Sequence, residues 1–382
     1  PTGGGPYDSQ VRVYQTIADS DFTITNISVK EYTVNNLARV DYTDGTSSLL
    51  VEPQRTNLIT YSEDFSQWVI DGESTITSNS ATSPDGTRNA DKLIAGTISG
   101  RQAIKFITSA SGDLSFSVYA KKSGYSFIQL TDGQDATAFA NFDLNAGVVG
   151  SSAVYTPTII DMGNDWYRCI ATWNAGVAIN NARIGLITSS TSIRVETFSG
   201  NGTNGAYLFG AQLEVGSYGT SYIPTYGTTV TRLQDQYEKT GISDLINSEE
   251  GVLFLEASTF ENGADCRITL SDGTITNRVS IEWDILANTI KGFVGSDGNL
   301  VSPATYNQTD SNKIALKYKV NDCALWINGT EVSTDFSVSS LSGVNQLEFS
   351  NYGGTVPFEG KVKQLKVYKT ALTDSELATL TT

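Results

Sequence analysis

Residues 48–68 read SLLVEPQRTNLITYSEDFSQW and mark the point at which the chain begins a new domain. The stretch starts as the apolar run LLV, and Pro53 then interrupts it. Proline has no backbone N–H to donate, so this position cannot lie in a central strand. Apolar residues resume at Leu58 and recur as far as Trp68. The pattern predicts a strand, a crossing segment and the start of a domain built from strands.

Residues 56–232 show the two-residue periodicity of strands. Leu114, Phe116 and Val118 alternate with serines, which places the apolar side chains on one face. Segments 166–173 and 206–215 alternate similarly, and turn dipeptides separate the strands at Asp85-Gly86, Asp132-Gly133, Asn201-Gly202 and Asn204-Gly205. No segment has a sustained helical period. Short strands joined by such turns predict a β-sandwich or jelly roll.

A second β-domain is predicted over residues 251–382, after a linker at 233–250. Its clearest strands are residues 252–259, 267–270, 279–285, 289–294, 313–320 and 324–327. Local chemistry predicts one helix near the end of the chain. Thr373 and Glu376 have the spacing of a capping box, and Leu372 with Leu377 has that of a hydrophobic staple.

The sequence also resembles known families. The stretch LLVEPQRTNLITYSEDFSQW, with AYLFGAQLEVGSYGTSYIPTYGTTVTR at 206–232, resembles the segments that open and close a carbohydrate-binding-module-like jelly roll in bacteriophage tail-fibre and head-spike proteins. The stretch KIALKYKVNDCALWINGTEV at 313–332 resembles the central hairpin of concanavalin-A-like and laminin-G-like lectin folds. FEGKVKQLKVYKTALTDSELATL at 358–380 resembles the last strand and helix of that fold.

These resemblances imply an all-β chain of tandem antiparallel β-sandwiches, a jelly roll and then a concanavalin-A-like domain, with one short C-terminal helix. FTITNISVKEY, at 22–32, resembles the last strand of a carbohydrate-binding-module-like sandwich. We therefore expect residues 1–32 to be the end of an upstream β-module or an oligomerising segment, and residues 33–55 to be a connector. The chain starts at Pro1 without a signal peptide, which indicates a piece of something longer.

Composition excludes several function classes. The 382 residues carry a net charge of −16, so the surface should repel nucleic acid and anionic membranes. Histidine is absent, which excludes a Ser-His-Asp triad, a Cys-His pair and a histidine metal site. Cys169, Cys266 and Cys323 cannot all pair with one another. We expect buried thiols, with a Cys266–Cys323 disulfide as the alternative.

An enzyme is considered because concanavalin-A-like folds include glucanases. Glu282 and Asp284 lie two residues apart and share a strand face, as the paired carboxylates of laminarinase-type glycosidases do. Those enzymes also need a general acid further along, and Ala287 stands at that position. We therefore interpret the pair as an exposed strand face and predict no catalysis. Calcium stays open as a structural ion without named ligands, because no EF-hand-type loop occurs.

A sugar site needs an aromatic ring face flanked by planar polar side chains. In the first domain Tyr119, Arg168, Trp173 and Gln212 are the candidates, on strand faces that strand parity turns away from Leu114, Phe116 and Val118. The competing interpretation is that the tryptophans belong to the core and that Arg168 lies at the rim.

From these observations we expect the chain to be a non-enzymatic component of a bacteriophage fibre or spike at the virion surface. Its predicted partners are bacterial surface polysaccharide, other virion proteins and two further copies in a homotrimer, with no nucleic acid and no membrane. The main alternative is a purely structural capsid or tail decoration protein, and a polysaccharide-degrading enzyme is the third class.

Overall fold

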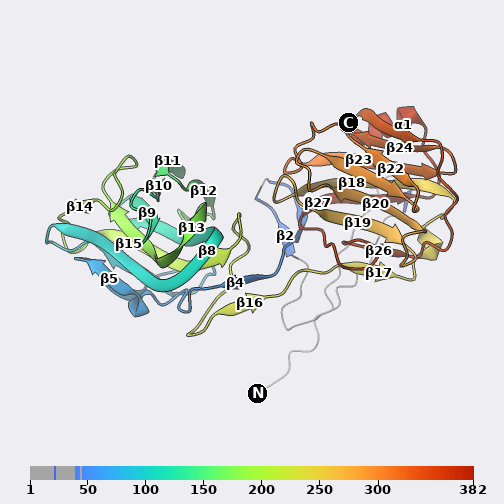
Figure 1. Ribbon diagram of the computed structural model, residues 1–382. Coiled ribbons are helices and arrows are strands. Elements are labelled where there is room, and N and C mark those ends of the chain that lie inside the picture. The colour runs from blue at the N-terminus through green and yellow to red at the C-terminus, as the bar shows by residue number, and fades with distance from the viewer. Residues whose placement is uncertain (1–20, 23–38, 44) are drawn as a thin grey trace, which may run out of the picture. The chain divides into compact units, whose positions relative to one another are not determined.

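The computed structural model describes residues 21–22, 39–43 and 45–382, and most of the segment 1–32 lies outside these ranges. The chain divides into two compact units (Figure 1). One unit, Gln54–Leu233, is called here the first sandwich. The second sandwich consists of Gln234–Thr382 together with the residues up to Pro53. Apart from short 3-10 turns and one α-helix, the regular structure of the described residues is β-strand, which confirms the predicted fold class.

The first sandwich consists of one large antiparallel sheet that folds over on itself and a separate two-stranded ribbon of β4 and β16. Its elements are β4 (Arg55–Asn57), a 3-10 turn (Phe65–Gln67), β5 (Val69–Gly72), β6 (Thr75–Ala81), β7 (Ala90–Ile94), β8 (Gly100–Ser123), β9 (Phe127–Asp132), β10 (Phe139–Asp143), β11 (Val148–Ala153), β12 (Thr156–Asp161), β13 (Tyr167–Ile187), β14 (Thr197–Phe198), β15 (Gly205–Val215) and β16 (Val230–Arg232). The main strand order is β11-β10-β9-β13-β8-β15-β7-β6.

Two long strands, β8 and β13, run through both layers of this unit. They pair with each other along their lengths, and the register shifts between Ala175 and Asn181. The curved β8 ribbon is visible in Figure 1. Ile128 and Phe142 from one half of the sheet share a buried cluster with Leu208 and Leu213 from the other half. The sheet therefore closes around one main apolar core.

The second sandwich contains two sheets. One has the order β2 (Arg39–Asp41), β3 (Ser48–Val51), β27 (Gly360–Tyr368), β18 (Glu250–Thr259), β23 (Asn312–Lys319), β24 (Cys323–Ile327) and β25 (Thr330–Asp335), with β1 (Asp21–Phe22) also pairing with β27. The other has the order β17 (Glu238–Thr240), β26 (Gln346–Glu348), β19 (Cys266–Ser271), β20 (Arg278–Trp283), β21 (Ile290–Val294) and β22 (Gly298–Val301), and a 3-10 turn spans Ser243–Leu245. Trp283 lies fully buried in the core that both sheets cover.

Two segments expected to be connecting chain belong to this second unit. Within 33–55, strand β3 pairs with β27, and Val51 is buried in the core. Within 233–250, Tyr237 and Ile246 are also core residues. The assignment of these segments to a connector and a linker is therefore corrected. The physical reason is that each carries apolar side chains at positions where a sandwich can bury them.

The C-terminal helix α1 (Asp374–Thr381) starts with the predicted capping box. The Thr373 N–H donates to the Glu376 carboxylate at 2.8 Å, and the Glu376 N–H donates to Thr373 Oγ1 at 3.4 Å. Leu377 is buried against Val252 and Trp326, so the helix is held on the sandwich by its apolar side. The capping box is thus confirmed, and Leu372 packs against the cluster that contains Leu377.

The three cysteines are free and buried, which confirms the buried-thiol interpretation and excludes the Cys266–Cys323 alternative. Burial raises the pKa of all three thiols, which keeps them protonated and unreactive. Within the described part of the chain, no helix combines the length and the apolar character needed to cross a membrane.

Candidate functional site

Three of the four predicted sugar-binding residues lie together on one outer face of the first sandwich. Tyr119 and Arg168 are direct partners across β8 and β13, and the guanidinium carbon lies 5.5 Å from the centre of the tyrosine ring. Gln212 lies on the neighbouring strand β15, and its amide nitrogen faces the Thr220 carbonyl that Arg168 also binds. Strand parity therefore predicted their common face correctly.

This face is covered by the chain itself. Segment 216–226 crosses it, and the Arg168 guanidinium donates to the Thr220 carbonyl at 2.7 Å. The Ile223 N–H donates to the Gln212 side chain at 2.7 Å, and Tyr222 packs edge-on against Tyr119. All three predicted residues are buried as a result. The prediction that they form an exposed sugar site is wrong, because parity defines a face but does not show what covers it.

Trp173 lies on the opposite face, in the core. Its cross-strand partner is Leu114, one of the residues it was expected to point away from. The indole stacks on Tyr155, with ring centroids 4.3 Å apart and an angle of 26° between the planes. Its assignment to a sugar site is therefore also corrected, and the core interpretation holds.

Glu282 lies on β20 and Asp284 directly follows that strand. Both side chains are buried, whereas we expected an exposed strand face. Glu282 forms an ion pair with Arg267 at 2.5 Å, and Asp284 forms one with Lys291. Burial raises the pKa of Glu282, and the charges of Arg267 and Lys291 oppose that shift. Both carboxylates are thus committed to neighbouring cations. Among the described residues, no group of three or more Cys, Asp or Glu side chains is arranged to hold a metal ion.

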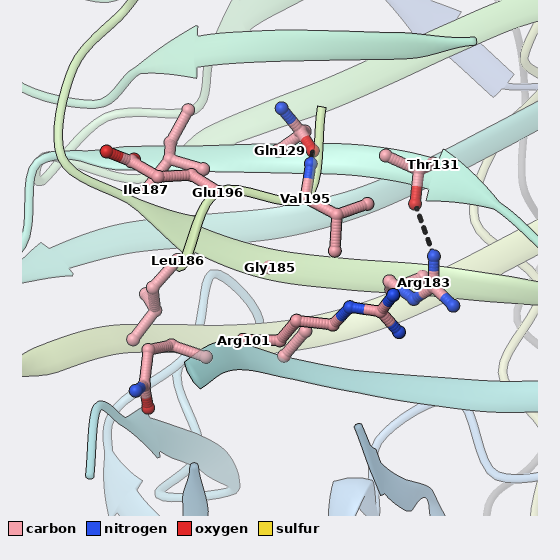
Figure 2. A pocket seen from close by; sticks show the side chains of 11 residues that line it. Arg101, Gln129, Thr131, Arg183, Gly185, Leu186, Ile187, Val195 and Glu196 are labelled. Carbon is pink, nitrogen blue, oxygen red and sulfur yellow. Dashed lines mark hydrogen bonds between the residues drawn. The ribbon is translucent and has the colours of Figure 1, made fainter. Parts of the chain in front are cut away.

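A different part of the first sandwich has the form of a binding site. On the outer face of β8, β13 and β9, Ala103 pairs with Gly185, and Gly185 pairs with Gln129. The two small residues in this row leave a small depression that is partly open to solvent. We call it the arginine hollow, and it is lined by Arg101, Gln102, Ala103, Gln129, Thr131, Arg183, Gly185, Leu186, Ile187, Val195 and Glu196 (Figure 2).

The charge of the hollow is set by three cations around one carboxylate. Asp71, the partner of Ala103 on β5, contacts Arg183 Nε at 2.7 Å, Lys105 Nζ at 3.1 Å and Arg101 at 3.6 Å. Burial lowers the pKa of Arg183, while the charge of Asp71 raises it. The Arg183 side chain is buried, whereas that of Arg101 is 51% exposed. Even with the carboxylate of Glu196, which also lines the hollow, three cations face two carboxylates, so one positive charge remains in excess.

The chain before β14 forms one wall of the arginine hollow. Gln129 holds it, because its side chain accepts the Val195 N–H at 2.7 Å and donates to the Ile193 carbonyl at 3.1 Å. Val195 has a φ of +53°, a conformation that is unfavourable for a β-branched residue. Such strain persists only where surrounding contacts enforce it, and it occurs most often at ligand-binding sites. Glu196 is fixed nearby by Thr188 and Ser192.

Sequence reasoning missed this site. A signal existed, because Arg183 alternates with the apolar residues Ala182, Ile184 and Leu186, and Arg101 is the second residue of the strand that starts GRQAIKF. Parity alone could have placed each arginine on an outer face. It could not have shown that the two strands pair in the register that brings the arginines around Gly185.

No family profile and no curated protein matches this chain. Among solved structures, it is similar to the CBM40 module of a Ruminococcus gnavus IT-sialidase bound to α2,3-sialyllactose, with 22% identity over 36% of this chain and 84% of that chain and a TM-score of 0.31. A putative carbohydrate-binding protein from Bacteroides ovatus gives 9% identity, coverages of 74% and 78%, and a TM-score of 0.32. The chain is also similar to domains LG4-5 of the mouse laminin α1 chain, with 9% identity over 72% of this chain and 88% of that chain and a TM-score of 0.26. At these scores the sandwich architecture rests on the strands and cores described above.

Proposed function

We propose that this chain is a non-enzymatic component of a bacteriophage fibre or spike, and that its first sandwich binds a bacterial surface polysaccharide through the arginine hollow. The observation that carries the proposal is the row Ala103–Gly185–Gln129, which leaves an open depression bordered by Arg101 and Arg183. The main alternative remains a purely structural decoration protein of a capsid or tail.

The size and charge of the hollow suggest which part of a glycan would bind. The hollow is small and partly open to solvent, so we expect it to receive one charged group of a glycan and not a whole sugar ring. A carboxylate of the glycan would accept hydrogen bonds from Arg101, whose side chain is 51% exposed. An acidic sugar is therefore the favoured ligand. The chain as a whole carries −16, so such a ligand would need this local reversal of charge.

Gly185→Val should abolish binding at the hollow by filling it. The glycine does not have a positive φ, and a Cβ at this position would meet only the Ala103 Cβ at 3.6 Å and the Gln102 carbonyl at 3.9 Å. The variant should therefore fold. We expect at least a tenfold loss of affinity, measured by calorimetric titration with a ligand chosen from a glycan array.

The matched control is Gly176→Val, because Gly176 is exposed and has no atom near its Cβ position. It should bind like the parent. Arg101→Gln should also weaken binding, and it should flatten the salt dependence of the affinity because one charge is lost. If Gly185→Val binds as tightly as Gly176→Val, the hollow is not the site and the structural alternative is favoured.

The proposal includes an absence of catalysis. Glu282 and Asp284 are paired with Arg267 and Lys291, and Ala287 stands where a general acid would be required. The double variant Glu282→Gln, Asp284→Asn should therefore not change the release of reducing sugar from host polysaccharide by the parent particle. Loss of a measurable activity in a folded double variant would contradict this.

Assembly as a homotrimer in the virion is the second part of the proposal. Phage fibres are usually three-fold, and closed symmetry places identical surfaces around one axis. Three weak sites on one fibre would then act together on a cell surface. Light scattering on a chain that includes its native upstream region should report three copies. A stable monomer there would refute the trimer without affecting the sugar site.

A further inference from the structure

A second polar and aromatic surface lies on the first sandwich, where the chain before β5 meets the chain before β16. Tyr61 and Tyr226 are partners in an isolated antiparallel bridge, so their side chains share one face. Glu63 lies beside Tyr226, because its carboxylate accepts a hydrogen bond from the Tyr226 hydroxyl. We call Tyr61, Glu63 and Tyr226 the tyrosine platform.

The backbone under the platform is rigidly held. The Gly227 N–H donates to the Thr60 carbonyl at 2.6 Å, and the Thr225 hydroxyl donates to the Ile59 carbonyl at 2.7 Å. The Thr225 N–H also donates to Ser62 Oγ at 2.8 Å. Positions on both sides of the bridge are thus fixed before any ligand arrives, which reduces the entropy that binding would cost.

The side chains are oriented by a shared carboxylate. Tyr226 is 75% exposed, yet its hydroxyl donates to Glu63 Oε1 at 3.2 Å. The Tyr222 hydroxyl donates to the same oxygen at 3.0 Å, and the Asn89 amide donates to Oε2 at 3.2 Å. An aromatic ring is therefore presented to solvent in a restrained orientation, beside a carboxylate with further accepting capacity.

We propose that the tyrosine platform binds an uncharged sugar ring as a site separate from the arginine hollow. The Tyr226 ring would stack on the C–H face of the sugar, and Glu63 would accept hydrogen bonds from its hydroxyls. The nearby carboxylates of Asp64 and Asp85 disfavour an acidic sugar at this position. The two sites therefore differ in the charge of the sugar that each takes.

The test uses the full chain and millimolar methyl glycosides of glucose, galactose, mannose and N-acetylglucosamine, observed by saturation-transfer difference NMR. At least one of these sugars should receive saturation from the parent protein, mainly at the protons of one ring face. Tyr226→Ala should reduce that signal at least fivefold. Tyr226→Phe keeps the ring but loses its bond to Glu63, so it should give an intermediate signal.

Two controls separate this site from other effects. Tyr42→Ala removes a tyrosine that is 67% exposed in the second sandwich, and it should leave the signal unchanged. Gly185→Val, which fills the arginine hollow, should also leave it unchanged. If the parent gives no signal with any of the four sugars, or if Tyr226→Ala matches Tyr42→Ala, the tyrosine platform is not a sugar site. Loss of the signal in Gly185→Val would assign it to the hollow instead.

Discussion

Asn57→Ala should lower the free energy of unfolding of the first sandwich by about 3–5 kcal/mol, because it would leave several buried polar groups unpaired. The Asn57 side chain is fully buried. Its amide donates to the Ala211 carbonyl at 3.1 Å and to the Ile223 carbonyl at 2.9 Å. Its oxygen accepts the N–H groups of Ile59 and Leu213. Truncation removes four hydrogen bonds at once.

Urea denaturation read by hydrogen exchange at the amides of β8 and β13 would measure this loss within the first sandwich alone. The control is Thr56→Ala, one residue away, where the side chain makes a surface hydrogen bond with Thr231. Its cost should be under about 1 kcal/mol, as for most surface changes. Equal effects of the two substitutions would contradict the role given to Asn57.

Asn57 lies where the first and last strands of the first sandwich, β4 and β16, pair with each other. Arg55 lies over the ring of Tyr218 at 5.1 Å, and β4 pairs with β16. Glu214 is fully buried, and its carboxylate accepts the Thr220 N–H at 2.8 Å and the Thr220 hydroxyl at 2.6 Å. Residues from the stretches 54–68 and 206–232 thus meet within the first sandwich. Much of their chemistry serves to close this domain.

Local patterns predicted the architecture well, because each depends on neighbours in the sequence. The alternation at 114–118 identified a core face, and the spacing of Thr373 and Glu376 identified the one α-helix of the described chain. The same reasoning failed for 33–55, since nothing in that stretch shows that β3 pairs with β27 more than three hundred residues later. Pairing at that distance depends on the register of the whole sheet.

The candidate site was beyond local patterns for the same reason. Arg101 and Arg183 come from strands far apart in the sequence, and Asp71 from a third. Their meeting depends on two pairings, β8 with β13 and β5 with β8, and a shift of one residue in either would turn a side chain to the other face. For Tyr119 and Gln212, local alternation predicted which face of the sheet they share. It could not predict that segment 216–226 covers that face.

Trp173→Ala should destabilise the first sandwich by about 3–5 kcal/mol, the usual cost of truncating a core aromatic residue. The indole belongs to the buried cluster and stacks on Tyr155, whose hydroxyl donates to Asp132 at 2.8 Å. Its loss would leave a cavity beside a tyrosine that this bond holds in place. Thermal unfolding followed at the amides of β13 would record the effect.

The size of the effect separates packing from ligand binding. Trp173→Phe should cost about 1 kcal/mol, because most of the buried apolar volume is kept, and the indole N–H has no hydrogen-bond partner among the described residues. Under conditions where Trp173→Ala remains folded, it should bind glycan at the arginine hollow as the parent does, since the indole points to the opposite face from Gly185. If Trp173→Ala is as stable as the parent but no longer binds glycan, Trp173 is a sugar-binding residue and not a core residue. Truncating a core residue should lower the stability.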